Sequence, residues 1–467
     1  MATYETIDEN PYTRGIASFV SGLRYEELPE EVRNRIKLLI LDSLGCALYA
    51  SRLPWSRIVV ETLRRLDTSS ACTVWGTSEK LSAPHAALVN GTMVQGYEID
   101  DVHRKGILHV GAVTLPAIMA VAELHPRMSG QDFLTAAVAG YEIGPRVGMC
   151  MGSEHIGQGW HSGATTGVFS AAGGAASALG LSEEKAIHAI GIAGTQSSGL
   201  MAAQYGAMVK RMHAGRASQS GLYGALLAEN GFTGIVNVFE SPYGGFCTTF
   251  SRSSDRFDLS ELTSGLGKRY ETMNISLKFY SCAATNHTTL DSLRAMQKTR
   301  PFKADEVNRI RVWGHQITVD HVGWPYRAQG VTSAQLNLPF CVATLLLEGD
   351  VFVDQFSEEM VSNPARMALA EKVEVIHDPK ITAMGREFRH LVRVKVELRD
   401  GTVLKESAED YRGSEKNFGT DADIINKFEK LVCHILPHGQ VDRLRDTVLG
   451  LEKVERAMDL AHLLVTT

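Results

Sequence analysis

Residues 163 to 181 of the chain read GATTGVFSAAGGAASALGL, and this stretch decides the fold class. Nearly all of its side chains are small, so a helix formed here brings its backbone close to the backbones of its neighbours. The stretches 111–123 and 218–230 share this Ala- and Gly-rich composition. Such helices are typical of a buried helical bundle, and Asn230-Gly231 supplies a C-terminal stop for the last of them.

Helix signals extend on both sides of these stretches, from residue 11 to about residue 265. Pro29, followed by two glutamates, suits the start of a helix, because proline fits the first turn and acids favour the positive end of the dipole. Ser182 precedes another pair of glutamates in the same way. Gly45 is expected to interrupt or cap the first of these helices, whose apolar residues recur at helical spacing at Val32, Ile36, Leu39, Ile40 and Leu44.

The pattern changes beyond about residue 265. Val392, Val394 and Val396 alternate with charged residues, as in a strand with one buried face. Asp400-Gly401 follows, and this pair favours the positive φ angles of a tight hairpin turn.

We therefore predict a mainly α fold with two domains. A large all-helical domain would comprise residues 1–265 and 405–467, because the tail beyond Asp421 returns to helical periodicity. A smaller α+β domain would comprise residues 266–404.

The composition is that of a globular protein with a mildly acidic balance. Of the 467 residues 44% are hydrophobic, and the formal net charge of −6 argues against a nucleic-acid or membrane-surface partner. The seven cysteines include no CxxC pair, which favours reduced thiols and excludes a clustered iron–sulfur site. The polar N-terminus resembles neither a signal peptide nor a transit peptide, and the apolar runs are too short to span a bilayer. We expect a cytoplasmic protein.

Four polar islands interrupt the apolar sequence. They contain acids, imidazoles and a lysine, the groups that move protons at carbon and bind carboxylates. No P-loop, GxGxxG, GxSxG or HExxH motif accompanies them, which disfavours nucleotide-dependent and serine-hydrolase chemistry. The combination favours carbon-acid chemistry without a cofactor.

The first island contains the adjacent acids Asp100 and Asp101, with His103 and His109 close behind. Adjacent carboxylates repel each other, so one of the two should have a raised pKa or a cationic partner. A solvated loop, a metal site and an acid–base loop all fit these residues. The spacing of a known metal motif is absent, so we predict no metal.

The second island places His161 at the start of the small-residue helix. The helix dipole there disfavours a protonated imidazole, so His161 is a candidate neutral base. The alternative is a structural histidine packed beside Trp160.

The third island brings Lys210, Arg211, His213 and Arg216 into one short segment between apolar helices. Such cations bind carboxylates when they converge on a cleft, although a surface patch is the alternative.

The fourth island contains Cys282 and His287. Cys282 is a candidate nucleophile, but a small buried cysteine is the simpler interpretation, and His287 taken alone fits a structural role.

The order of these islands resembles that of the MmgE/PrpD family, which contains dehydratases, decarboxylases and epimerases of small carboxylates. The resemblance covers nearly the whole chain, and no single motif decides it. The segments that carry it are residues 39–46 (LILDSLGC), 89–91, 100–109, 159–161, 167–169, 175–176, 179–181, 210–217, 231–234 and 278–287.

The resemblance implies a large helical domain with a smaller α+β lid, a homodimer, no cofactor, and an active site between the two domains that takes a small carboxylate. By motif position the catalytic residues would be Asp100, Asp101, His109, His161, Lys210 and His287, and the substrate-binding residues would be His103, His213, Arg216, Cys282 and His321.

Two positions depart from the family pattern. Val102 stands where decarboxylase-type members have a small hydroxyl residue, and Ala283 stands where dehydratase-like members have an arginine that would clamp a carboxylate. Three functions therefore stay open: a dehydratase or decarboxylase of a small di- or tricarboxylate, an epimerase of a related carboxylate, and a non-catalytic ligand-binding homologue.

Overall fold

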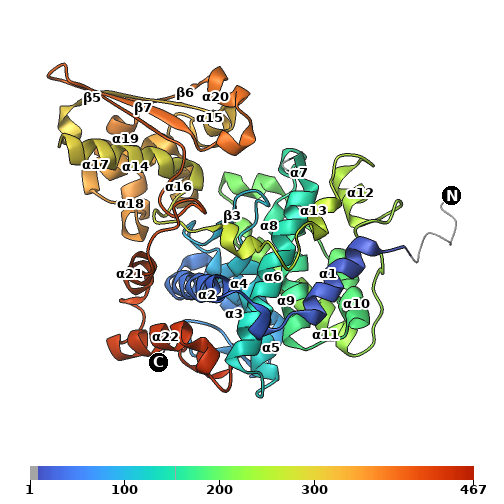
Figure 1. Cartoon of the computed structure of the whole chain (residues 1–467). Helices are drawn as coiled ribbons and strands as arrows, with labels where there is room; N and C mark the ends of the chain where they lie inside the picture. Colours follow the sequence, from blue (N-terminus) through green and yellow to red (C-terminus); the bar gives the residue numbers. More distant parts are fainter. Residues whose placement is uncertain (1–8, 153, 467) are drawn as a thin grey trace.

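The computed structural model describes residues 9–152 and 154–466, and it confirms the mainly α fold (Figure 1). Residues 1–8 of the polar N-terminus, on which the prediction about targeting peptides partly rests, lie outside the described residues. The helices of the N-terminal part are α1 (Pro11–Gly22), α2 (Glu30–Ala50), α3 (Pro54–Arg64), α4 (Ala83–Val94), α5 (Val110–Leu124), α6 (Gly130–Met151), α7 (Glu154–Gly157), α8 (Ser162–Thr165), α9 (Gly167–Ala178), α10 (Glu183–Gly194), α11 (Val209–Glu229), α12 (Phe246–Ser251) and α13 (Ser260–Thr263).

Small residues allow these helices to pack backbone against backbone, as predicted. Helix α9 packs against α5, α6 and α11 (Figure 1). A Cβ atom on Gly221 of α11 would lie 2.4 Å from the Cβ of Ala171 in α9. A Cβ atom on Gly91 of α4 would lie 2.7 Å from the Cα of Gly215 in α11. Only glycine fits at such contacts, so they fix how α4, α9 and α11 stack.

The two predicted helix starts are close to the observed ones. Pro29 is the N-cap residue of α2, and the Ser182 hydroxyl accepts a hydrogen bond from the backbone N–H of Lys185 at the start of α10. The prediction for Gly45 was wrong, because this residue lies inside α2. A Cβ atom there would meet Phe428 at 3.0 Å, so close packing of another helix explains the glycine.

The C-terminal part carries a small sheet covered by helices. Strands β5 (Val307–Gly314), β6 (Val373–His377), β7 (Val392–Leu398) and β8 (Val403–Ala408) lie in the order β6-β5-β7-β8, with β5 and β6 parallel and the other pairs antiparallel. The predicted hairpin is β7–β8, and Gly401 in its turn has a φ of 86°. Strand β8 extends beyond residue 404, the predicted limit of this domain. The helices are α14 (Ala284–Thr299), α15 (Gln316–Val322), α16 (Val331–Leu336), α17 (Leu338–Glu348), α18 (Glu358–Val361), α19 (Pro364–Ala370) and α20 (Pro379–Ala383).

The end of the chain returns to the helical part. Helices α21 (Asp421–Val432) and α22 (His438–Leu449) pack against α2, and α23 (Asp459–His462) follows them (Figure 1). Two short antiparallel pairs complete the fold. Strand β1 (Cys72–Thr73) pairs with β2 (Lys80–Leu81), and β3 (Val102–His103) pairs with β4 (Ile275–Ser276). No helix in the described chain combines the length and apolarity needed to cross a membrane.

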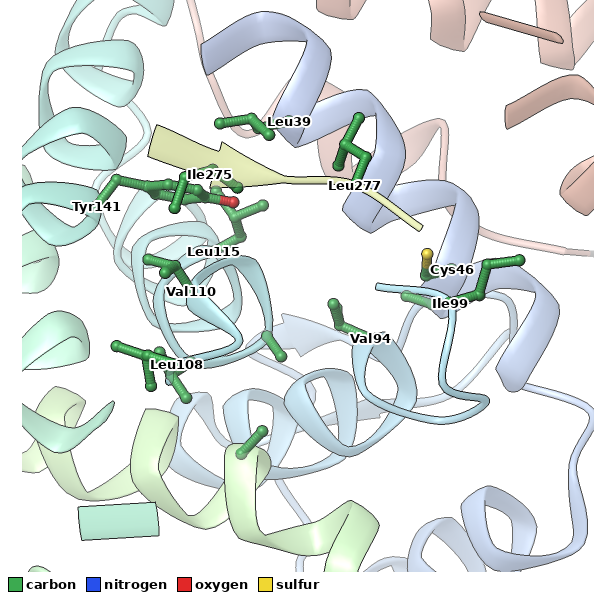
Figure 2. Close-up of a cluster of buried hydrophobic side chains, with 14 of the residues drawn as sticks. Leu39, Cys46, Val94, Ile99, Leu108, Val110, Leu115, Tyr141, Ile275 and Leu277 are labelled. Carbon is green, nitrogen blue, oxygen red and sulfur yellow. The ribbon is translucent and has the colours of Figure 1, made fainter. Parts of the chain in front are cut away.

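A cluster of buried apolar side chains lies beneath the segment that joins α4 to α5 (Figure 2). Ile99 from this segment, Leu39 from α2 and Leu277 from the segment after β4 are all at most 1% exposed. The segment therefore packs its apolar side chains against this buried cluster, and its polar side chains lie outside the cluster.

Candidate active site

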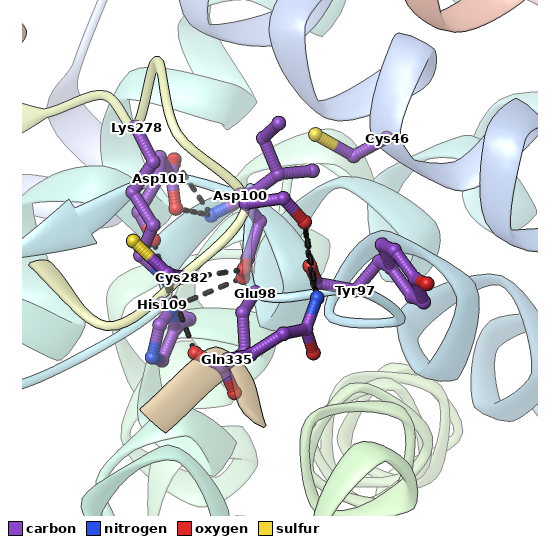
Figure 3. A network of polar contacts seen from close by, with 12 residues as sticks. Cys46, Tyr97, Glu98, Asp100, Asp101, His109, Lys278, Cys282 and Gln335 are labelled. Atoms are coloured by element: carbon purple, nitrogen blue, oxygen red, sulfur yellow. Dashed lines mark hydrogen bonds and ion pairs between the residues drawn. The ribbon is translucent and has the colours of Figure 1, made fainter. Parts of the chain in front are cut away.

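The acidic loop, residues 97–109 between α4 and α5, forms the centre of the candidate site (Figure 3). Glu98 has a φ of 56°, a left-handed conformation that non-glycine residues rarely adopt. Such strain persists only where the surrounding contacts hold the residue in place.

Three cationic side chains surround the Glu98 carboxylate, which is 4% exposed. Lys210 forms a very short contact with Oε1, Arg211 Nη1 lies 2.6 Å from the same oxygen, and Lys278 Nζ lies 3.3 Å from Oε2. We call Glu98, Lys210, Arg211 and Lys278 the cation cluster. Its net formal charge is positive, because one carboxylate faces three cations.

Burial and mutual charge together shift the pKa values in the cation cluster. Burial alone would raise the pKa of Glu98, but Lys210, Lys278 and Arg211 hold it well below its usual range. Burial lowers the pKa of Lys210, Glu98 opposes this shift, and Arg211 and Lys278 add to it. The pKa of Lys278 is raised, because Glu98 and Asp100 outweigh the effect of burial. Lys210 is therefore the cation that gives up a proton more readily than an ordinary lysine.

Asp100 and His109 form a carboxylate–imidazole pair beside the cation cluster (Figure 3). His109 Nδ1 lies 3.0 Å from Asp100 Oδ2 and 2.8 Å from the backbone oxygen of Asp101. Both neighbours are acceptors, so Nδ1 carries the proton and donates it. Among the described residues, Nε2 of this half-buried imidazole has no hydrogen-bond partner. His109 can therefore transfer a proton through Nε2 while Asp100 orients the ring.

Asp101 points away from this pair and caps helix α5. Its two carboxylate oxygens each accept the Gly111 N–H at 3.1 Å, and the Tyr141 hydroxyl donates to Oδ2 at 2.8 Å. Burial first, and Asp100 second, raise the pKa of Asp101 to about 7. Asp100 instead has a lowered pKa, because His109 and Lys278 outweigh its burial. The structure thus gives one acid a raised pKa and the other a cationic partner.

His161 and His213 form a second imidazole pair. Their Nδ1 atoms lie 3.1 Å apart, and both side chains are buried. Burial first, and Lys210 next, hold the pKa of His161 well below its usual range and lower that of His213. Both rings are then neutral at pH 7, so one Nδ1 carries a hydrogen and the other accepts it. His161 is the N-cap residue of the short helix α8, whereas the small-residue helix that the sequence placed directly after it begins at Gly167 as α9.

His321 belongs to the C-terminal part, where it lies near the end of α15 and is exposed. It lines a cavity of ≈ 400 Å³ whose walls come from Gln204 and from residues between Asp320 and Leu336. Lys210 is one of the charges that act on His321.

The other sequence-predicted residues are placed apart from these groups. His103 is buried, with Nε2 3.1 Å from Glu271 Oε2 and Nδ1 accepting the Gly106 N–H at 2.9 Å. Arg216 is exposed and donates to Gln219 on its own helix. These contacts hold the loop and the helix, and neither side chain pairs with the cation cluster.

Cys282 and His287 are also buried away from solvent. The His287 ring packs between Tyr280 and Tyr411, with centroids 5.1 Å and 5.0 Å away, and its Nε2 lies 3.4 Å from the Cys282 backbone oxygen. Burial first raises the pKa of the Cys282 thiol well above its usual range, which disfavours the thiolate that a nucleophile requires.

The sequence-based set of site residues omitted Glu98 and Lys278, and it named Arg211 only among the cations near Lys210. The sequence held a signal for Lys278, which is the one charge between Ile275 and Cys282. A lysine in such an apolar segment needs a buried partner of opposite charge. Which acid would serve could not be read from sequence, because Glu98 is distant along the chain.

Comparisons with known proteins show which family this chain resembles along nearly its whole length. Models of the MmgE/PrpD N-terminal and C-terminal domains match residues 14–258 and 280–453. The cis-aconitate decarboxylase-like protein oryM of Aspergillus oryzae is 34% identical over 99% of both chains. The cis-aconitate decarboxylase of Aspergillus terreus is 32% identical over 99% of this chain and 98% of its own. The 2-methylcitrate dehydratase of Escherichia coli (strain K12) is 21% identical over 95% of each chain.

The chain belongs to the MmgE/PrpD family. It is an enzyme, a lyase of the type found in that family. Within the described ranges, no group of three or more His, Cys, Asp or Glu side chains is arranged to hold a metal ion.

Proposed function

We propose that this lyase acts on a small di- or tricarboxylate without a resident cofactor, and that decarboxylation of cis-aconitate is its principal reaction. The observation that carries the proposal is the cation cluster, in which Lys210, Arg211 and Lys278 converge on Glu98 beside the Asp100–His109 pair. The names of the relatives with 32–34% identity support the choice of cis-aconitate.

The cation cluster would bind the substrate carboxylates. Arginine and lysine form charge-assisted hydrogen bonds with carboxylates, and these bonds are strengthened where water is excluded. Lys210, Arg211 and Lys278 carry three positive charges, whereas Glu98 and Asp100 supply two negative ones. A bound anionic substrate would neutralise the remaining positive charge, and this would reduce the repulsion among the three cations.

His109 would carry the proton to carbon. When the C–C bond to the departing carboxylate breaks, CO₂ leaves and its bonding electrons remain on the substrate carbon. The cations stabilise the negative charge that develops there. Protonated His109, paired with Asp100, then delivers its Nε2 proton to the carbon. Neutral His161 and His213 would border the substrate without competing for its carboxylates.

Dehydration is the second candidate reaction. The same His109 proton would then go to a leaving hydroxyl group, and a base would take a proton from the neighbouring carbon. Relatives with 21% identity named 2-methylcitrate dehydratase support this possibility.

The test is incubation of the purified chain with cis-aconitate, citrate and 2-methylcitrate. Release of CO₂ from cis-aconitate supports the proposal, and alkene absorbance from the hydroxyacids without CO₂ supports dehydration. Deuterium exchange at carbon without net product would instead favour an epimerase. Dialysis against a chelator should leave the rate unchanged, since Glu98 and Asp100 already pair with cations. No turnover in a broad carboxylate panel would overturn the proposal.

A further inference from the structure

A buried ion pair lies directly behind the acidic loop. Lys427 of α21 places its Nζ 2.5 Å from Asp42 Oδ1 of α2, and both side chains are at most 2% exposed. The same Nζ donates a hydrogen bond of 2.7 Å to the backbone oxygen of Ile99. Helices α2 and α21 lie side by side, so the pair is enclosed between them (Figure 1).

The hydrogen bond from Lys427 reaches the middle of the acidic loop, because Ile99 lies in that loop. Ile99 stands between Glu98, which pairs with Lys210, and Asp100, which pairs with His109. Its side chain belongs to the buried apolar cluster against which the loop packs (Figure 2). Lys427 therefore holds the backbone of Ile99, which lies between Glu98, a residue in the left-handed conformation, and Asp100.

The charge of Lys427 also affects the loop through its partner Asp42. Asp42 is fully buried, and it is one of the negative charges that act on Asp100 and Asp101. Burial raises the pKa of Asp42, and the charge of Lys427 opposes this shift. Pairing with Lys427 therefore balances the charge of Asp42 and leaves further N–H groups of Lys427 for the loop.

We propose that Lys427 is a positioning residue, which acts through Ile99 to hold Glu98 and Asp100 in the geometry required for turnover. The inference rests on the proposed lyase function, and it gives helix α21 a direct link to the site. Because a displacement of about 1 Å at a reacting group can cost about 100-fold in rate, loss of this anchor should lower kcat more than it alters KM.

The test uses the full chain with Lys427→Met, and with Lys430→Met as the matched control. Lys430 is exposed on the same helix. Since a lone buried Asp42 could prevent folding, Asp42→Asn/Lys427→Met is the second variant, which removes both charges and the anchor. Kinetics are measured at a temperature where each variant is folded. Hydrogen exchange of the peptide covering residues 95–109 is followed by mass spectrometry.

We expect about a 100-fold loss of kcat and faster exchange in both Lys427 variants, with wild-type values for Lys430→Met. A kcat within twofold of wild type in a folded Lys427 variant overturns the proposal, because the ion pair is then only structural. Should the wild-type chain turn over no carboxylate, the lyase proposal fails separately. Faster exchange of the loop then still supports the anchoring role, and unchanged exchange overturns it.

Discussion

Glu98 shows why the chemistry of this site depends on charge balance at single residues. A buried carboxylate with three cationic neighbours is strongly stabilised in its ionised form, whereas the three cations share this one carboxylate. Burial lowers the pKa of Lys210. After burial, Lys210 has the largest effect on the pKa of His161. It is therefore the cation whose removal tests the site most directly.

Lys210→Met should lower kcat/KM by about 1,000-fold, because a preorganised cation is lost while Glu98 keeps Arg211 and Lys278 as partners. Arg216→Met on the same helix is the matched control, since that side chain is exposed. Steady-state kinetics with cis-aconitate, the substrate proposed above, measure both variants. Equal losses in the two variants would show that Arg216 also binds substrate, as the motif position implied.

Asp101 predicts a dependence of stability on pH. Its pKa is about 7 in the folded chain, above the ordinary value of 3.8. Between these values the folded state holds a proton that the unfolded state has lost, so this stabilising contribution is present at low pH and is lost as the pH rises towards 7. Relative to Asp101→Asn, the wild type should lose roughly 3 kcal/mol of unfolding free energy between pH 5 and pH 8.

Urea unfolding of both proteins at the two pH values measures this difference, and titrations shared by the two proteins cancel. A constant difference would mean that Asp101 is ionised throughout, held by Tyr141 and Gly111.

At the scale of elements, the stacking of α4 on α11 depends on glycine. A Cβ atom on Gly215 would lie 1.9 Å from the backbone oxygen of Leu88, which cannot move without disturbing α4. Gly215→Ala should therefore cost about 3 kcal/mol of unfolding free energy, and it should also displace Lys210 at the start of the same helix. Gly22→Ala is the control, because no atom lies within 4 Å of a Cβ there. Chemical denaturation that found equal stabilities would contradict this packing argument.

Sequence periodicity and capping predicted the elements well because these signals are local. The hairpin at Asp400-Gly401 and the start of α10 at Ser182 each depend on residues close in the chain. The prediction for Gly45 was wrong because this glycine is explained by its close contact with Phe428, which lies on a helix near the other end of the chain. The partners of Glu98 escaped prediction for the same reason, since no local pattern pairs it with Lys278.

At the scale of the whole molecule, the site exists only when distant segments meet. The acidic loop, the start of α11 and Lys278 each bring charges that would be unpaired alone. Gln204 of the N-terminal part and His321 of the C-terminal part line one cavity. Pairing of two chains, which the family resemblance implied, stays a prediction that light scattering of the purified protein will check.

Gln335 of α16 joins the two parts of the molecule at this site. Its amide donates 3.0 Å hydrogen bonds to the backbone oxygen of Tyr97 and to the Ser281 hydroxyl, and its Oε1 accepts from Arg211 at 3.3 Å (Figure 3). The side chain is fully buried, so no water replaces these partners. Gln335 thus connects the acidic loop, the cation cluster and the C-terminal part.

Gln335→Met keeps the volume and removes all three hydrogen bonds. We expect a loss of about 2 kcal/mol in unfolding free energy, because Arg211 and Ser281 lose buried partners. We also expect kcat/KM to fall about tenfold, since Arg211 is then held by fewer contacts, which corresponds to about 1.4 kcal/mol. Gln329→Met, at an exposed glutamine near α16, should change stability by less than about 0.5 kcal/mol. If the two variants unfold alike in urea, the contact between the two parts does not depend on Gln335, and the apolar packing around it must carry the connection.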